Sequence, residues 1–150
     1  MAHMRRLLRK AYILAFIPLL LLLPRPLRVE HLLTGYESIS VYSYSLPSAE
    51  NCECAGGIYI SRMTEAEYRE KAPRGFAVSL TFSDKSAEEV LAKLGAAERF
   101  RQDLDGTTVI YAYSRSVSGE VVVMGSRINV QIAVSDGVLT VGSPLIAGSY

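Results

Sequence analysis

The two cysteines of the chain are the side chains with the most scope for chemistry. Cys52 and Cys54 are separated by one residue and are the only cysteines in the sequence. An extended backbone places both sulfurs on one side, which suits a short-loop disulfide, half of a soft-metal site, or thiols that pair with another chain. The only histidines, His3 and His31, both belong to the N-terminal region, so Cys and His cannot complete a four-ligand zinc site. We expect a disulfide or structural thiols, with a redox or metal-responsive role as the alternative.

The other polar residues do not form a recognisable catalytic set. A nucleophile needs a base and a group that orients it. Serines are abundant, but there is no histidine after His31 and no Ser-x-x-Lys spacing. The Gly56-Gly57 pair lacks the strand–turn–helix context of a phosphate-binding loop. The sequence therefore predicts a protein that is not an enzyme and has no bound metal or cofactor.

Aromatic side chains are the candidates for recognition of a partner. Tyrosines at strand spacing either line a groove for a peptide or carbohydrate, or lie half-buried in a sheet. The last residues, Gly142 to Tyr150, could themselves form a docking strand. The candidate partner-binding residues are Tyr42, Tyr44, Tyr59, Tyr111, Tyr113 and Tyr150.

The distribution of charge argues against a nucleic-acid partner. The chain has 16 Lys and Arg against 15 Asp and Glu, but six of the bases precede residue 29. Downstream of that point 10 bases face all 15 acids, a net charge of −5. Nonspecific nucleic-acid affinity comes from clustered Lys and Arg, so we expect no nucleic acid to bind.

The first 28 residues have the pattern of a signal anchor. Four bases in residues 5–10 precede thirteen uncharged residues, Ala11 to Leu23. This stretch is shorter than the roughly 20 residues that span a bilayer, but flanking leucines and snorkelling Lys10 and Arg25 lengthen it. No small-residue cleavage site follows Leu23, which favours an uncleaved anchor over a cleaved secretion signal. The excess of bases before the segment predicts a cytoplasmic N-terminus and a body outside the membrane.

Two Asp-Gly pairs predict tight β-hairpins. Asp136-Gly137 suits a type I′ turn between 128–134 and 138–141, with Val134 opposite Leu139. Apolar and polar residues alternate along 128–134, which predicts one buried face. Asp105-Gly106 makes a second such turn and pairs Phe100 with Tyr111.

The remaining elements complete the expected fold. Turns at 118–119 and 125–126 predict a further strand, with Val123 opposite Ile128. Capping boxes at Thr64 and Ser86 begin two helices, and alternation predicts strands near 37–46, 58–63 and 76–82. Residues 29–35 are expected to be a linker or helical turn. We therefore predict a single α+β domain over 36–150, a mainly antiparallel sheet with two helices on one face and a C-terminal four-stranded β-meander.

The C-terminal hairpins carry residues that point to a family. Ile128-Asn-Val-Gln-Ile-Ala133, Leu139-Thr-Val-Gly-Ser-Pro-Leu-Ile146 and the end at Tyr150 resemble the YwmB-like proteins of Gram-positive spore formers, over roughly 91–150. That family of exported proteins is described as TATA-box-binding-protein-like on grounds of fold, and the shared residues contain no catalytic signature. The resemblance implies an exported α+β protein tied to the cell envelope or to sporulation, and a fold label does not imply DNA binding.

Two classes of function follow from the sequence. One is a non-enzymatic envelope module that binds a protein or peptide, through a sheet edge or the tyrosines. The other is a thiol-redox or metal-responsive protein that uses Cys52 and Cys54. The first is favoured because a tethered sheet without an assembled catalytic group needs only a partner.

Overall fold

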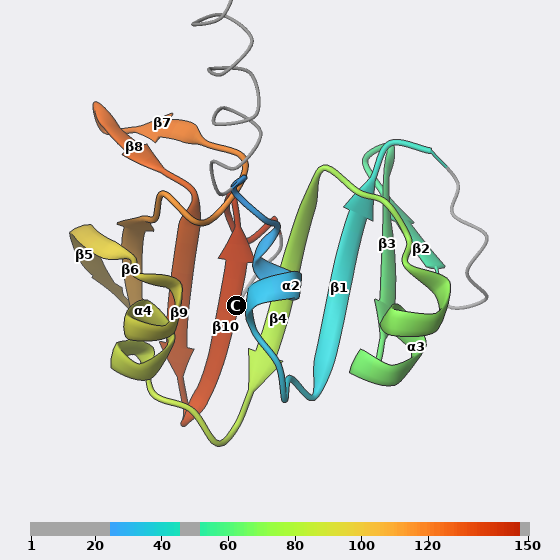
Figure 1. The fold of residues 1–150 in the computed structure, drawn as a ribbon, viewed down its shortest axis with the longest axis horizontal. Coiled ribbons are helices and arrows are strands. Elements are labelled where there is room, and N and C mark those ends of the chain that lie inside the picture. Colours follow the sequence, from blue (N-terminus) through green and yellow to red (C-terminus); the bar gives the residue numbers. More distant parts are fainter. Residues whose placement is uncertain (1–24, 46–51, 148–150) are drawn as a thin grey trace, which may run out of the picture.

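The computed structural model describes residues 25–45 and 52–147 and is built on one eight-stranded sheet (Figure 1). The strand order is β2-β3-β1-β4-β10-β9-β6-β5, and each neighbouring pair is antiparallel. The strands are β1 (Ser38–Ser43), β2 (Cys52–Ala55), β3 (Ile58–Met63), β4 (Ala77–Phe82), β5 (Ala97–Leu104), β6 (Thr107–Tyr113), β9 (Val130–Ser135) and β10 (Val138–Ser143). The expected α+β class with a mainly antiparallel sheet is confirmed.

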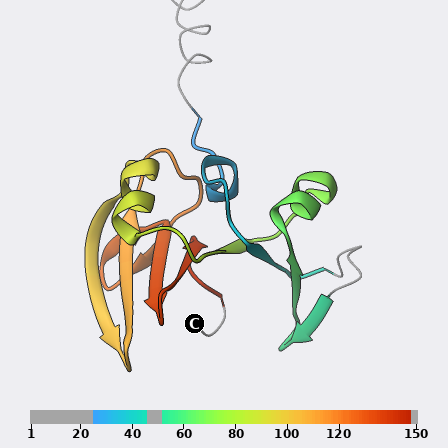
Figure 2. The ribbon, with the colours of Figure 1, turned by 90° about the horizontal axis from the view of Figure 1, so that it is seen from below.

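The two longer helices begin at the hydroxyl N-caps that the sequence indicates. In α3 (Glu65–Lys71) the Thr64 hydroxyl accepts from the Glu67 N–H while the Glu67 carboxylate accepts from the Thr64 N–H. Ser86 and Glu89 make the same reciprocal contacts in α4 (Ala87–Leu94), which ends at Gly95 with φ +56°. Both capping boxes satisfy N–H groups that a helix start otherwise leaves unpaired. With α2 (Val29–Leu32), these helices lie on one face of the sheet (Figure 2).

The main core lies between the helices and the sheet. Apolar residues alternate along the central strands, so Val78, Leu80 and Phe82 of β4 point to the helices and are almost fully buried. Val90 and Leu94 of α4 and Tyr68 of α3 join the same cluster. Burial of such a continuous apolar cluster is the main term that stabilises the fold.

The Asp-Gly hairpins form in the expected registers. Val134 pairs with Leu139 across Asp136-Gly137, and both turn residues have positive φ. Phe100 pairs with Tyr111 across Asp105-Gly106. Agreement between turn chemistry and the apolar pattern fixed these registers.

The expected turn at 125–126 is wrong by one position. The turn residues are Met124 and Gly125, so Val123 pairs with Ser126 and Val121 with Ile128. The resulting strands, β7 (Val121–Val123) and β8 (Ser126–Ile128), form a separate two-stranded hairpin, and β6 pairs directly with β9. The observed turn requires Met124 at φ +49°, a backbone conformation that residues other than glycine rarely adopt. For that reason the sequence pattern favoured Gly125 and Ser126 as the turn residues.

The expectation of a single buried face on 128–134 is also wrong. Gln131 and Ala133, on the face away from the helices, are as buried as Ile132. The chain after β10 folds back over that face, and the Ile146 N–H donates to Oε1 of Gln131 at 2.8 Å. A side chain on Gly142 would meet the Ile146 backbone at 2.4 Å, so this close approach requires glycine.

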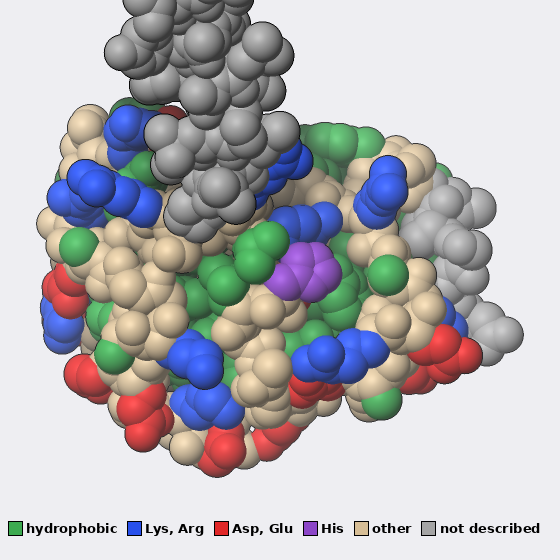
Figure 3. Space-filling model, in the orientation of Figure 1, with side chains coloured by type: hydrophobic (Ala, Val, Ile, Leu, Met, Phe, Trp, Pro, Cys, Tyr) green, Lys and Arg blue, Asp and Glu red, His purple; other side chains and the backbone are tan. Residues whose placement is uncertain are grey.

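Within residues 29–35, Val29–Leu32 form the helical turn α2, which packs into the body. Val29 of α2 and Leu33 after it are buried in the main core, while His31 is exposed (Figure 3). Just before α2, Leu27 bridges Val117: its N–H donates to the Ser116 carbonyl and its carbonyl accepts from the Ser118 N–H. The chain is thus fixed to the sheet domain from Leu27 onward.

Candidate functional site

The two cysteines lie on β2, at one edge of the sheet. Cys52 is opposite Ser61 and Cys54 opposite Tyr59 on β3, so both sulfurs lie on the same face. Cys54 is exposed, Cys52 is half-buried, and both are free thiols. Glu53 between them points to the other face, where its carboxylate accepts from Arg62 at 2.9 Å.

The backbone of this edge strand has an open side. Gly56-Gly57, both at positive φ, form the two-residue turn between β2 and β3. In such a hairpin the residues that flank the turn form the hydrogen-bonded pair, and pairs alternate from there. Ala55 and Glu53 therefore direct their N–H and C=O groups to β3, whereas those of Cys52 and Cys54 point to the open side. Among the described residues no strand covers that side.

The opposite edge of the sheet is better protected against a new strand. β5 has an irregular register between Glu98 and Phe100. Glu98 and Arg101 form a salt bridge of 2.7 Å, which holds the pKa of the Glu98 carboxyl below its usual value. Bulges and charged side chains are the features that natural sheets use to block edge pairing, so β2 is the more receptive edge.

Few polar contacts surround the thiols within the described residues. In residues 25–45 and 52–147, no three side chains of the His, Cys, Asp and Glu types are grouped closely enough to hold a metal ion. Cys52 Sγ lies 3.7 Å from the Glu53 carbonyl, its own neighbour in the chain. The two thiols therefore lie side by side on one face of β2, next to its unpaired backbone edge.

The structure does not bring the candidate tyrosines together on one surface. Strand alternation places Tyr59 on the helix face and the other strand tyrosines on the opposite face. Tyr42 is buried there, and Tyr111 stacks on Phe100 at 4.4 Å between ring centroids. Tyr44 follows β1, is exposed, and stacks on Phe76 at 4.4 Å. Tyr150 lies outside the described residues.

Tyr113 belongs to a basic pocket that the sequence did not indicate. The guanidinium carbons of Arg99 and Arg127 lie 5.6 and 5.5 Å from the centre of its ring, a cation–π arrangement. Arg115 and Ser116 complete a pocket of about 430 Å³. These arginines come from β5, β8 and a loop, so their proximity depends on how these three segments pack in the fold.

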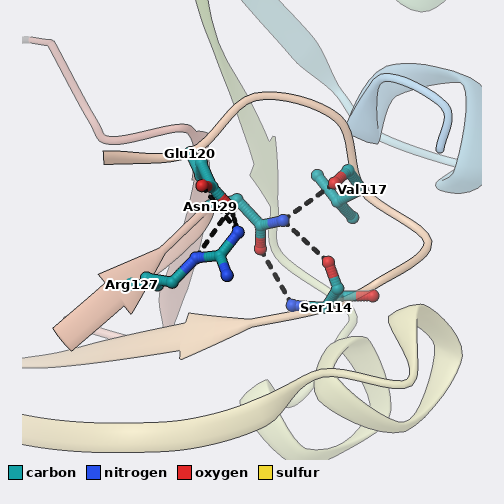
Figure 4. A network of polar contacts seen from close by, with 5 residues as sticks. All are labelled: Ser114, Val117, Glu120, Arg127 and Asn129. Atoms are coloured by element: carbon teal, nitrogen blue, oxygen red, sulfur yellow. Dashed lines mark hydrogen bonds and ion pairs between the residues drawn. The ribbon is translucent and has the colours of Figure 1, made fainter. Parts of the chain in front are cut away.

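Buried hydrogen bonds hold the loop beside this pocket (Figure 4). Oδ1 of Asn129 accepts from the Ser114 N–H at 2.9 Å, and its Nδ2 donates to the Ser114 and Val117 carbonyls at 2.7 and 2.8 Å. Beside it, Arg127 binds the Glu120 carboxylate, which raises the pKa of the guanidinium. The loop that carries Arg115 is therefore in a defined position relative to β8.

A second buried polar group joins α2 to α3. The Glu30 carboxylate, 3% exposed, accepts from Nε of Arg28 at 2.6 Å and from the Tyr68 hydroxyl at 3.0 Å. Burial and the neighbouring Glu30 raise the pKa of Tyr68 to about 12. This contact fixes the position of α2, and with it the direction in which the chain leaves the domain.

The described residues leave out most of the proposed membrane segment. No helix within 25–45 and 52–147 has the length and apolar character that crossing a bilayer requires, and the proposed membrane segment 1–28 lies almost wholly outside these ranges.

No protein-family model, curated protein or solved structure matches the chain.

Proposed function

We propose that the protein is a membrane-anchored, extracytoplasmic module that is not an enzyme and binds a protein or peptide as an added strand at the open side of β2. The observation that carries the proposal is this edge, with outward backbone groups at Cys52 and Cys54 and no protecting bulge. Main-chain hydrogen bonds supply affinity in strand addition, and alternate side chains supply specificity. A partner strand would lie beside both thiols.

The location rests on the sequence of the N-terminal segment. Residues 11–23 carry no charge, and bases are concentrated before them. A YwmB-like identity, a TATA-box-binding-protein-like fold and a role in the envelope or in sporulation belong to the same proposal, supported by the C-terminal motif residues. The net charge of −5 after residue 28 supports a partner other than nucleic acid.

A proline at Cys54 tests strand addition directly. Cys54→Pro removes an N–H from the open side of an edge strand, a position where proline is tolerated in sheets. The matched control, Cys54→Ser, keeps the N–H and removes only the thiol. We expect crosslinked capture of the partner in the native host to be lost in Cys54→Pro and retained in Cys54→Ser, with both proteins folded.

The same pair of variants addresses the alternative, a thiol-redox or metal-responsive protein. The observation that favours it is the exposed, free thiol of Cys54. Loss of capture in both variants, and in a Cys52→Ser, Cys54→Ser double variant, would identify the thiols as the functional groups. Capture that survives in Cys54→Pro would exclude the open side of β2 as the binding edge.

A further inference from the structure

The end of the sheet at which the chain enters carries exposed arginines together with exposed apolar side chains. We call it the entry end: the carboxyl ends of β1, β2, β6 and β10 and the amino ends of β3, β4, β5 and β9, where Leu27 pairs with Val117. The β7–β8 hairpin lies at this end in Figure 1. Any surface that holds residues 1–24 must therefore approach the entry end.

The chain between the uncharged stretch, residues 11–23, and Leu27 is short, and this limits how far Leu27 can lie from that stretch. Four residue steps separate Leu23, the last residue of the uncharged stretch, from Leu27. An extended chain advances at most about 3.6 Å per residue, so the two lie within about 14 Å. If the stretch sits in a bilayer, as the proposed function requires, the entry end is at the depth of the lipid headgroups.

The charge of the entry end is positive. Four exposed arginines, Arg25, Arg74, Arg99 and Arg115, form no ion pair with any described residue. The acids of this end are paired with bases: Glu120 with Arg127, Glu98 with Arg101, and the buried Glu30 with Arg28. Figure 3 shows Lys and Arg on both the upper and the lower part of this face, whereas most Asp and Glu lie along its lower edge.

Exposed apolar side chains accompany these arginines. Val122 and Met124, at the tip of the β7–β8 hairpin, are 71% and 76% exposed. The stacked Tyr44 and Phe76 lie at the ends of β1 and β4 on the same end of the sheet. Large apolar residues that project from an otherwise charged surface mark an interaction site.

We propose that the entry end lies on an anionic lipid surface. The guanidinium groups of Arg99 and Arg115 beside Tyr113 bind lipid phosphates, and Val122 and Met124 enter the boundary between headgroups and acyl chains. This inference rests on the anchored location in the proposed function, and it adds an orientation in which β2 and the basic pocket lie at opposite edges of the sheet.

A single introduced tryptophan measures the contact, because the chain has no tryptophan of its own. Full-length Met124→Trp is reconstituted into phosphatidylcholine–phosphatidylglycerol vesicles that contain acyl-brominated lipid. We expect a blue-shifted emission and strong quenching by the bromines. The control is Val138→Trp, 41% exposed in the β9–β10 turn at the opposite end of the sheet, whose emission should stay red and unquenched.

A charge-reversal pair separates lipid recognition from simple proximity. Arg99→Glu with Arg115→Glu, added to Met124→Trp, should reduce quenching in vesicles with phosphatidylglycerol, whereas Lys85→Glu with Lys93→Glu should not. Equal quenching of the tryptophans at 124 and 138 in protein that floats with the vesicles would overturn the inference and leave the anchor intact. Protein that does not float would overturn both.

Discussion

At the scale of single residues, buried polar side chains determine the local geometry. Asn129 falls on the polar side of an alternating strand, and its sequence neighbours predict a solvent-facing side chain. It is instead 1% exposed, because the loop at 114–117 supplies three hydrogen-bond partners for its amide. Those partners lie twelve to fifteen residues away in the chain, so no local pattern could have indicated them.

Tyr68 gives a pH-dependent test at this scale. Its folded pKa of about 12 lies above the unfolded value of 10.0, so the folded state holds the proton more tightly. The stabilisation is complete below pH 10 and is lost as the pH rises toward 12. We expect Tyr68→Phe to lower the free energy of unfolding by about 1 to 3 kcal/mol at pH 8, since Glu30 loses a buried donor, and by less at pH 11.

Urea unfolding at the two pH values measures this difference. Tyr44→Phe is the matched control, since Tyr44 is 73% exposed and makes no contact with Glu30. A deficit in Tyr68→Phe that is the same at pH 8 and pH 11 would contradict the assigned role of the hydroxyl.

At the scale of elements, the sequence predicts those helix starts and turns whose hydrogen bonds and backbone angles depend on only a few neighbouring residues. The capping boxes at Thr64 and Ser86 and the Asp-Gly hairpins are correct because their hydrogen bonds and positive φ angles are local. The β7–β8 register, the burial of the second face of β9 and the pocket around Tyr113 depend on distant segments. Sequence reasoning found Tyr113 but could not find the arginines beside it.

Gly142 tests the element that covers the second face. Gly142→Ala would place a methyl group 2.4 Å from the Ile146 backbone nitrogen, so residues 144–147 must shift and the Ile146–Gln131 hydrogen bond should break. We expect a loss of about 1 to 3 kcal/mol in the free energy of unfolding. Thr140→Ala, on the same strand and face, is the control and should cost less. Equal losses would mean that the C-terminal segment does not depend on this close approach.

At the scale of the whole molecule, we propose one role for the β2 edge of the sheet and another for the entry end. The open side of β2 suits a partner strand, and the entry end, with its unpaired arginines and apolar hairpin tip, suits a lipid surface. The proposed function places the folded body outside the cytoplasmic membrane, held at it by residues 1–28. That location is the central claim of the account.

The native cysteines allow this claim to be measured without altering the protein. Cys54 is exposed, and the chain has only two cysteines. Intact cells are treated with a membrane-impermeant phosphine reductant and then with an impermeant maleimide, with Cys52→Ser, Cys54→Ser as the unlabelled control. We predict that the wild-type chain is labelled in intact cells as fully as after lysis. Labelling that appears only after lysis would place the body in the cytoplasm and contradict the account.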